Sequence, residues 1–316
     1  MRVVITGGSG LIGRAVAASL AAEGNDVVVL SRDPARVRGL PAGVRAAHWD
    51  SHSAAGWETL LEGRSAVINL AGEAIAAGRW TGERKRRIRA SRVDAGRAVV
   101  DAVRLAAEEG RAPAVVVQAS GIGYYGDTGD QEIGEDHPPG GDFLAEAAIA
   151  WEASTAEVET LGVRRVVLRT GVVLDREGGA LAKMLPLFRL GLGGPLGGGR
   201  QWFPWIHIAD EVGAILFLLA TAAASGPFNL CAPRPVQNRD FARTLGRQLR
   251  RPTILPAPAP ALRLALGELA EALLTGQRAH PHRLLAAGYP FRHPDLPEAL
   301  ADLLARPNHR PSSEGR

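Results

Sequence analysis

The sequence predicts an α/β fold, a doubly wound parallel sheet followed by a smaller C-terminal region. Three observations support this prediction: β-branched runs alternate with helix-length segments, the runs are almost continuously apolar, and a glycine-rich turn directly follows the first run. Continuously apolar runs are typical of parallel strands whose two faces are both covered by helices. Regular alternation of strands and helices is typical of the doubly wound arrangement.

Five segments before residue 170 are the expected strands: Arg2–Thr6, Val27–Leu30, Ala66–Leu70, Ala114–Ala119 and Arg165–Arg169. Two long helices are expected between the later strands. Glu83–Ala107 carries apolar residues mostly three or four positions apart, which gives a helix one apolar stripe. Phe143–Leu161 is rich in Ala and Glu, which favour helices.

The character of the chain changes after about Leu174. The expected elements are then a glycine-rich loop (191–200), a helix (Ile208–Ala222), a strand (Phe228–Leu230), a proline-rich stretch (Pro252–Pro260) and two helices (Ala261–Leu274 and Pro297–Leu304). The proline-rich stretch is expected to be non-helical, because proline lacks the N–H that a helix interior needs.

Composition argues against several classes of protein. The single cysteine, Cys231, cannot form an intrachain disulfide. No apolar stretch reaches the roughly 18 residues of a membrane-spanning helix, and a strand-like run follows Met1 where a signal peptide would lie. The net charge of +4 arises from interspersed charges, without zinc-finger spacing or an RNA-binding aromatic motif. We expect a cytoplasmic protein with no membrane, nucleic-acid or metal partner; its oligomeric state stays open.

The turn after the first expected strand carries the glycines of a dinucleotide site. Gly7, Gly10 and Gly13 follow Arg2–Thr6 and open a helix, which is the context that such a motif requires. Gly7 allows the tight turn, Gly10 lets the backbone approach a pyrophosphate, and Gly13 permits close packing of helix on strand. The pyrophosphate then lies at a helix N-terminus, which favours an anion. The pattern predicts a Rossmann-type fold; a merely structural turn is the alternative.

The end of the second expected strand indicates which dinucleotide binds. NAD proteins usually place an acid there, which binds the ribose 2′-hydroxyl. Here the residues are Ser31 and Arg32, and a hydroxyl with a guanidinium suits a 2′-phosphate. We therefore expect NADP rather than NAD. Asp33 is the counterargument, since its side chain could turn toward the ribose instead.

Longer motifs resemble a known family. GGSGLIG at the N-terminus, NLAG at Asn69–Gly72, YYG at Tyr124–Gly126 and HIAD at His207–Asp210 are similar to motifs of the extended short-chain dehydrogenases/reductases. More narrowly, RWTGERKRRIRASR (79–92), SGIGYYGDTGD (120–130), LRTGVVL (168–174) and GGRQWFPWIHIAD (198–210) resemble an atypical, sugar-nucleotide-epimerase-like family with its own small C-terminal domain. Residues 252–291 look like that domain, so the resemblance covers almost the whole chain.

The resemblance implies a role for each matching position. It assigns the pyrophosphate to Gly7, Gly10, Leu11, Ile12 and Gly13, the 2′-phosphate to Ser31 and Arg32, the adenine to Asp50, the nicotinamide-side ribose to Leu70, Ala71 and Gly72, and the nicotinamide to Val172. Arg92, also assigned to cofactor binding, stands where most short-chain dehydrogenases have an active-site asparagine, and the epimerase-like family is similar in having an arginine there. The implied organisation is a mainly NADP-binding region (1–174), a mixed region that completes the sheet and the substrate cleft (175–250), a small substrate-side helical region (251–306) and a disordered tail (307–316).

The usual catalytic pair of the superfamily is missing. Its tyrosine is followed four residues later by a lysine, which lowers the pKa of the phenol for proton transfer. No tyrosine of this chain has that lysine, and the helix register places Leu144 and Ala148 at the two positions, with Glu152 one turn further on. The epimerase-like family is similar in lacking the pair. Neither Leu144 nor Ala148 can transfer a proton.

Other residues are candidates for the chemistry. Ser120 stands where it would hydrogen-bond a substrate oxygen, or it caps a turn. Tyr125, or its neighbour Tyr124, could replace the missing acid, although YG in ordinary members only lines the pocket. His207 could act as an acid or base, but a structural hydrogen bond is favoured. Arg79, Trp80, Trp202 and Trp205 could line a substrate pocket or pack between the domains.

Three hypotheses about function follow from these residues. The first is an NADP-dependent oxidoreductase or epimerase-like enzyme that acts on an unknown carbonyl or hydroxyl compound, in which Ser120 polarises the oxygen. The second is a non-catalytic NADP-binding sensor or regulator, which the missing tyrosine–lysine pair favours. The third is a scaffold with a vestigial site, which the intact glycines argue against.

Overall fold

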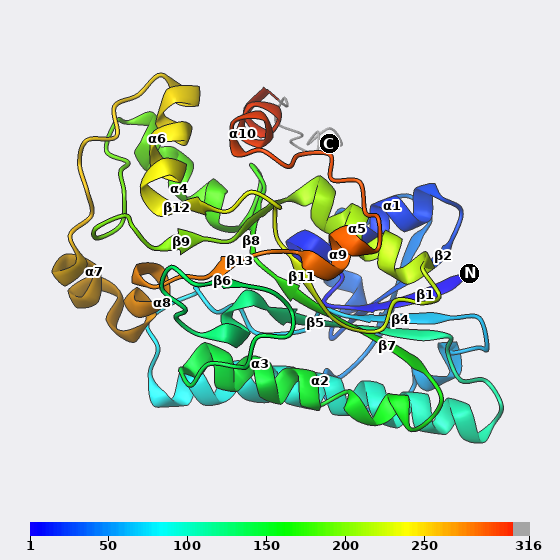
Figure 1. Cartoon of the computed structure of the whole chain (residues 1–316). Coiled ribbons are helices and arrows are strands. Elements are labelled where there is room, and N and C mark those ends of the chain that lie inside the picture. Colours follow the sequence, from blue (N-terminus) through cyan, green and yellow to red (C-terminus); the bar gives the residue numbers. More distant parts are fainter. Residues whose placement is uncertain (306–316) are drawn as a thin grey trace.

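The structure, a computed structural model, describes residues 1–305; the predicted tail at 307–316 lies outside the described residues. At its centre is an all-parallel sheet of seven strands in the order β11-β7-β5-β4-β1-β2-β3 (Figure 1). These strands are β1 (Arg2–Thr6), β2 (Asp26–Ser31), β3 (Val44–His48), β4 (Ala66–Asn69), β5 (Val115–Gly121), β7 (Arg164–Thr170) and β11 (Gly226–Leu230). The strand order reverses beside β1, and ligands of such sheets bind at the carboxyl ends of the strands at this point.

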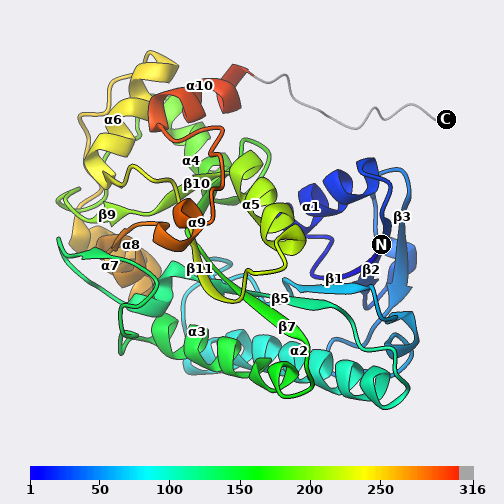
Figure 2. The ribbon, with the colours of Figure 1, turned by 45° about the vertical axis from the view of Figure 1, so that its right-hand side comes forward.

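Helices cover both faces of the sheet (Figure 2). On one face lie α1 (Leu11–Ala22) and α5 (Ile208–Ala220), and on the other α2 (Gly82–Glu108) and α3 (Phe143–Ala153). The remaining helices described are α4 (Gly179–Arg189), α6 (Asn238–Leu249), α7 (Ala259–Leu266), α8 (Glu271–Leu274), α9 (His282–Ala286) and α10 (Leu296–Ala305). Along β1, Val3 and Ile5 pack in the cluster that holds α1 and α5, whereas Val4 packs in the cluster that holds α2. Burial on both faces is the reason why the strands are continuously apolar.

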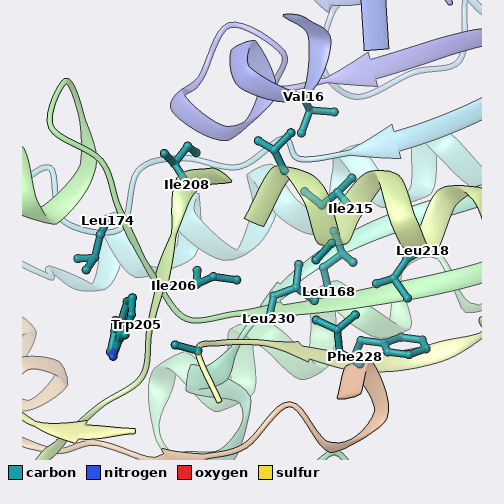
Figure 3. Close-up of a cluster of buried hydrophobic side chains, with 14 of the residues drawn as sticks. Val16, Leu168, Leu174, Trp205, Ile206, Ile208, Ile215, Leu218, Phe228 and Leu230 are labelled. Carbon is teal, nitrogen blue, oxygen red and sulfur yellow. The ribbon is translucent and has the colours of Figure 1, made fainter. Parts of the chain in front are cut away.

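The larger hydrophobic cluster lies between the sheet and α5 (Figure 3). Leu168 of β7 and Leu230 of β11 pack in it with Ile215 of α5. Trp205 belongs to the same cluster and is only 1% exposed. Of the two roles expected for Trp205, the structure therefore supports core packing.

Three two-stranded sheets stand apart from the main sheet. They pair β8 (Val172–Leu174) with β10 (Trp205–His207), β9 (Trp202–Phe203) with β12 (Val236–Gln237), and β6 (Glu132–Ile133) with β13 (Arg278–Ala279). The last pair joins the C-terminal part of the chain to the loop that follows β5. None of the helices in residues 1–305 is both long and apolar enough to cross a membrane.

The predicted elements are largely confirmed, with two differences in the helices. The segment predicted as one helix, Phe143–Leu161, is α3 followed by a short 3-10 turn at Ala156–Glu159. The helix predicted over Ala261–Leu274 begins earlier, at Ala259, with a proline in its first turn, where proline is tolerated. It is then interrupted at Gly267, whose φ of +61° a right-handed helix cannot contain.

Candidate functional site

The glycine turn between β1 and α1 is shaped by close backbone contacts. Gly7 has a φ of +66°, and a Cβ there would lie 2.6 Å from the Leu70 carbonyl oxygen. A Cβ on Gly13 would lie 2.5 Å from the Gly7 carbonyl oxygen, so α1 packs directly on the turn. Gly10 begins α1 without a side-chain cap. The first-turn N–H groups, those of Leu11, Ile12 and Gly13, therefore suit an anion.

The two residues expected at the 2′-phosphate lie at the end of β2. The Ser31 hydroxyl accepts a hydrogen bond from the Asp33 backbone N–H at 3.2 Å. The Asp33 carboxylate, which could have favoured NAD, forms an ion pair with Arg36 at 3.0 Å. The Arg32 side chain is exposed and makes no hydrogen bond or ion pair with another residue of the described chain. Its guanidinium is thus able to receive a phosphate.

Asp50 follows β3 and closes a local turn. Its Oδ1 accepts from the backbone N–H groups of His52 and Ser53, and its Oδ2 accepts from the Ser53 hydroxyl at 2.6 Å. These hydrogen bonds, that of the Ser53 hydroxyl foremost, lower the pKa of Asp50 to about 2. In this structure the carboxylate holds the loop together, so any contact with adenine would come in addition to that role.

Leu70, Ala71 and Gly72 leave β4 beside the glycine turn. The Thr6 backbone oxygen accepts from the Leu70 N–H, and the Thr6 hydroxyl accepts from the Ala71 N–H at 3.2 Å. That hydroxyl in turn donates to the buried Asn69 side chain at 2.6 Å. Buried hydrogen bonds of this kind hold the segment in one position, at the carboxyl edge where the sequence places the ribose.

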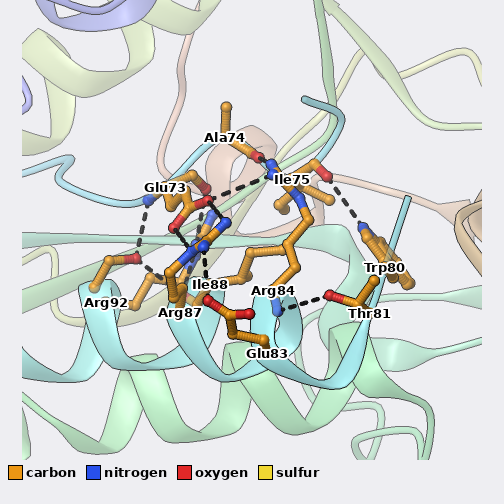
Figure 4. Close-up of polar contacts among 11 residues, drawn as sticks. Glu73, Ala74, Ile75, Trp80, Thr81, Glu83, Arg84, Arg87, Ile88 and Arg92 are labelled. Carbon is orange, nitrogen blue, oxygen red and sulfur yellow. Dashed lines mark hydrogen bonds and ion pairs between the residues drawn. The ribbon is translucent and has the colours of Figure 1, made fainter. Parts of the chain in front are cut away.

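Arg92 is buried on α2 beneath the same segment (Figure 4). Its Nη1 donates to the Ile88 carbonyl at 2.9 Å and to the Glu73 carbonyl at 3.1 Å. The guanidinium carbon lies 4.8 Å from the centre of the Trp151 ring. Burial lowers the pKa of Arg92 to about 10, which still leaves it charged near neutral pH.

A cavity of about 590 Å³ opens beyond the carboxyl ends of β5 and β7. Ser120, Thr170 and Val172 line it from the sheet side, and Arg92 lines it from α2. Its aromatic lining residues are Trp80, Tyr125, Phe143, Trp151, Trp202 and Phe203. Trp80 and Trp202 are therefore pocket residues. Arg79 is not among the lining residues, and its guanidinium donates to the Leu264 carbonyl instead.

Ser120 belongs to a network that its position in the sequence did not reveal. Its hydroxyl donates to Glu152 Oε1 at 2.7 Å. Arg169 holds the same carboxylate with two parallel hydrogen bonds, Nε to Oε1 at 2.9 Å and Nη2 to Oε2 at 3.0 Å. Sequence register placed Glu152 one turn beyond the missing lysine, but Arg169 offered only its position at the end of an apolar strand.

The hydroxyl of Tyr125 is committed to the same buried network. It donates to the Asn229 side-chain oxygen at 2.7 Å and accepts from Arg169 Nη1 at 2.9 Å. Burial raises the pKa of Tyr125 to about 12. A phenol with both partners satisfied and a raised pKa is poorly suited to proton transfer near neutral pH, so the geometry favours a positioning role.

The positions of the missing catalytic pair face the cavity. Leu144 and Ala148 both line it, and a Cβ on Gly123 would lie only 3.2 Å from the Leu144 Cβ. An apolar wall therefore stands where the superfamily places its tyrosine and lysine.

A buried carboxyl group lies next to Thr170, which lines the cavity. Glu211 accepts a hydrogen bond from the Thr170 hydroxyl at 2.9 Å. Glu211 is 1% exposed, and burial raises its pKa to about 8.

His207 has the structural role that was favoured for it. It is completely buried, its Nδ1 accepts from the Ala209 N–H at 3.0 Å, and it caps α5. Its Nε2 lies 3.2 Å from Asp302, and together with His293 these residues form a cluster of possible metal ligands. Because Nδ1 accepts a hydrogen bond, Nε2 carries the proton and has no lone pair for a metal. We therefore assign the cluster no metal.

These features place the chain among the Rossmann-type proteins related to the short-chain dehydrogenases. Family comparison narrows that class. A model described as the NAD dependent epimerase/dehydratase family matches residues 3–231, and one described as a domain of unknown function, DUF1731, matches residues 257–303. The chain belongs to the NAD-dependent epimerase/dehydratase family, with this second domain near its C-terminal end. The resemblance expected from the motifs is confirmed.

Individual relatives agree along most of the chain. It is 42% identical over 306 residues to Epimerase family protein Mb2239 of Mycobacterium bovis, with 96% of this chain and 98% of that protein covered. It is similar to the crystal structure of human epimerase family protein SDR39U1 (isoform 2) with NADPH, at 36% identity, a TM-score of 0.85 and coverage of 96% and 99%. A Corynebacterium glutamicum structure described as a nucleoside-diphosphate sugar epimerase matches at 33% identity and a TM-score of 0.75, covering 96% of this chain and 58% of that one.

Proposed function

We propose that the chain binds NADPH and uses it to transfer a hydride to or from an unidentified carbonyl or hydroxyl compound. The observation that carries the proposal is Ser120, a buried hydroxyl that lines an enclosed cavity at the carboxyl edge of the sheet. Val172 lines the same cavity, and the segment 70–72 leaves the sheet beside the glycine turn. A cofactor laid across this edge would bring its nicotinamide to the cavity.

The residues present suit NADPH. The glycine turn leaves room beside Gly10, where a Cβ would meet only the Gly7 oxygen at 3.2 Å, and the first-turn N–H groups of α1 suit the pyrophosphate. Arg32, exposed and without an ion pair among residues 1–305, suits the 2′-phosphate. The human relative is described with NADPH, which supports the same preference here. When bound, the nicotinamide supplies the hydride chemistry, and the protein orients the substrate and moves the proton.

Ser120 and Glu152 supply a path for that proton. The carboxylate of Glu152, paired with Arg169, accepts the one hydrogen bond that the Ser120 hydroxyl can donate. Ser120 then presents its lone pairs to the cavity and suits a substrate hydroxyl, whose proton it can accept as its own moves to Glu152. For reduction of a carbonyl the same path runs in reverse: Ser120 gives its proton to the substrate oxygen as the hydride arrives, and a proton that Glu152 has taken from solvent replaces it.

A second candidate function is a non-catalytic sensor of NADPH. The observation that favours it is the apolar wall of Leu144 and Ala148 at the usual acid–base positions. Binding without turnover would then be the whole activity.

Two measurements separate these functions. NADPH binding is followed by titration calorimetry, and hydride transfer by oxidation of NADPH with a broad panel of carbonyl compounds. We expect binding, followed by oxidation with at least one compound, and Ser120→Ala should slow that oxidation by about a hundredfold or more. Binding without oxidation across the panel supports the sensor. Absence of NADPH binding rejects both functions.

A further inference from the structure

We propose that the cavity takes an aromatic, singly charged anion, such as an aromatic 2-oxo or 2-hydroxy acid, and excludes nucleoside diphosphates. The proposal rests on the proposed function, because the ligand would be the hydride partner of NADPH. It departs from the expectation raised by the corynebacterial relative, which is described as a nucleoside-diphosphate sugar epimerase. Three features of the cavity carry it.

The first feature is the charge of the lining. Arg92 is the one cation among the lining residues that the structure describes, and Asp127, Asp142 and Glu271 are carboxylates on the same lining. A diphosphate carries two or more negative charges and needs several arginines, lysines or free N–H groups to compensate for lost water. This lining repels such a ligand instead.

Nearby cations offset only part of that balance. Arg263 pairs with Glu271, whereas Asp127 and Asp142 have no ion pair within residues 1–305, and Lys85 pairs with Glu268, which does not line the cavity. Arg278 stacks behind Trp202, at 4.9 Å from the ring centre, and lies 3.4 Å from a Glu132 oxygen. None of these three cations lines the cavity.

The second feature is the aromatic wall. Trp80 and Phe143 meet edge to face with their ring centres 5.0 Å apart, and Trp151 lies under Arg92. Trp202 and Phe203 of β9 also line the cavity. Flat apolar surfaces of this kind stabilise a planar, apolar ligand.

The third feature is the unused part of the Arg92 guanidinium. Arg92 is only 6% exposed, and Nη1 donates both of the hydrogen bonds that it makes within residues 1–305. Nε and Nη2 make no hydrogen bond to any part of the chain within residues 1–305. The nearest carboxylate, that of Glu73, already pairs with Arg84 and Arg87. A buried cation with two unused donors on a cavity wall suits one carboxylate held by two parallel hydrogen bonds.

The test uses the full chain saturated with NADP⁺, and titration calorimetry as the readout. The probes are aromatic 2-oxo acids from phenylglyoxylate to indole-3-pyruvate, the neutral primary amide of each acid, UDP and UDP-glucose. We expect at least one acid to bind, about tenfold or more tighter than its amide, and neither uridine compound to bind comparably.

Arg92→Met should remove the preference for the acid over the amide. Arg89→Met is the matched control: Arg89 lies on the same helix, is exposed and does not line the cavity. Thermal unfolding and NADPH affinity report whether each variant is intact. If Arg92→Met does not fold, the comparison of acid, amide and UDP on the unaltered protein decides alone.

The outcomes are separable from those of the proposed function. NADPH affinity is measured first, and its absence rejects the proposed function itself. With NADPH bound, comparable or tighter binding of UDP or UDP-glucose overturns the present proposal. So does equal binding of acids and amides, or failure of every acid to bind.

Discussion

At the scale of single residues, cofactor preference is concentrated in Arg32. Its guanidinium is exposed and unpaired within residues 1–305, while Asp33 is held by Arg36. Arg32→Ala removes a charge-assisted contact worth about 1.5–3 kcal/mol, so NADPH should bind roughly ten- to a hundredfold more weakly. NADH affinity should hardly change.

Fluorescence titration of both cofactors checks this prediction. Arg64→Ala, which removes an exposed arginine away from β2, is the control for net charge. Equal affinity of the unaltered protein for NADPH and NADH would contradict the assignment of Ser31 and Arg32.

The acid–base role also belongs to individual side chains. Ser120→Ala and Glu152→Gln should each lower kcat by about a hundred- to ten-thousandfold, the usual contribution of proton transfer. Tyr125→Phe should lower the free energy of unfolding by about 1–3 kcal/mol, because Asn229 and Arg169 lose a buried partner. Its kcat should change far less. If Tyr125→Phe lowered kcat as much as Ser120→Ala does, the phenol would be the missing acid.

Glu211 should leave a signature in the pH dependence of stability. Burial raises its pKa from about 4.5 to about 8 in the folded protein. Between these values the unfolded chain is ionised and the folded protein keeps its proton, so the free energy of unfolding falls as pH rises. Glu211→Gln keeps the acceptor for Thr170 and cannot titrate.

Urea unfolding at about pH 5 and about pH 8 checks this prediction. Between the two pH values the unaltered protein should lose stability relative to Glu211→Gln, on the order of a few kcal/mol. If the free energy of unfolding changed equally with pH in the two proteins, Glu211 would be ionised, or solvated, in the folded state.

At the scale of elements, the turn between β1 and α1 separates two kinds of glycine. A Cβ on Gly10 meets only the Gly7 oxygen, at 3.2 Å, whereas one on Gly13 would lie 2.6 Å from the Gly8 Cα. Gly10→Val should therefore fold but lose NADPH, since the branched side chain fills the space of the pyrophosphate. Gly13→Val should destabilise the fold itself.

Thermal unfolding with and without NADPH distinguishes the two variants. For Gly10→Val we expect an apparent melting temperature close to that of the unaltered protein, with no further rise on adding NADPH. An unchanged rise would mean that the cofactor does not contact this turn.

Elements were predictable from sequence where both faces of the chain are buried. β1, β4 and β7 are continuous apolar runs, so their positions followed from pattern alone. β3 was not predicted, because this edge strand is partly exposed along its whole length and its sequence is not a continuous apolar run. The pairing of Ser120 with Glu152 was out of reach, since 32 residues separate them and only the packing of α3 on the sheet joins them.

At the scale of the whole molecule, the C-terminal region closes the cavity. Residues 271–273 and 275–277 line it, and a Cβ on Gly276 would lie 2.0 Å from the Trp202 carbonyl oxygen. Gly276→Ala should push this segment away, lowering the melting temperature and substrate affinity while NADPH affinity is kept. Gly63→Ala, where a Cβ would meet nothing within 4 Å, is the control. Unchanged turnover in Gly276→Ala would show that this segment does not enclose the ligand.

The two-stranded sheet of β6 and β13 also bears on the order in which the protein can fold during synthesis. It joins residues 132–133 to residues 278–279, and α10 completes a cluster that begins with Val3. During synthesis the strands β1 to β7 emerge from the ribosome first and can pair there. The cavity is complete only once residues 275–277, the last of its lining, have emerged. The glycine turn that suits a nucleotide is therefore synthesised, and can fold with the first strands, before the cavity beside it is closed.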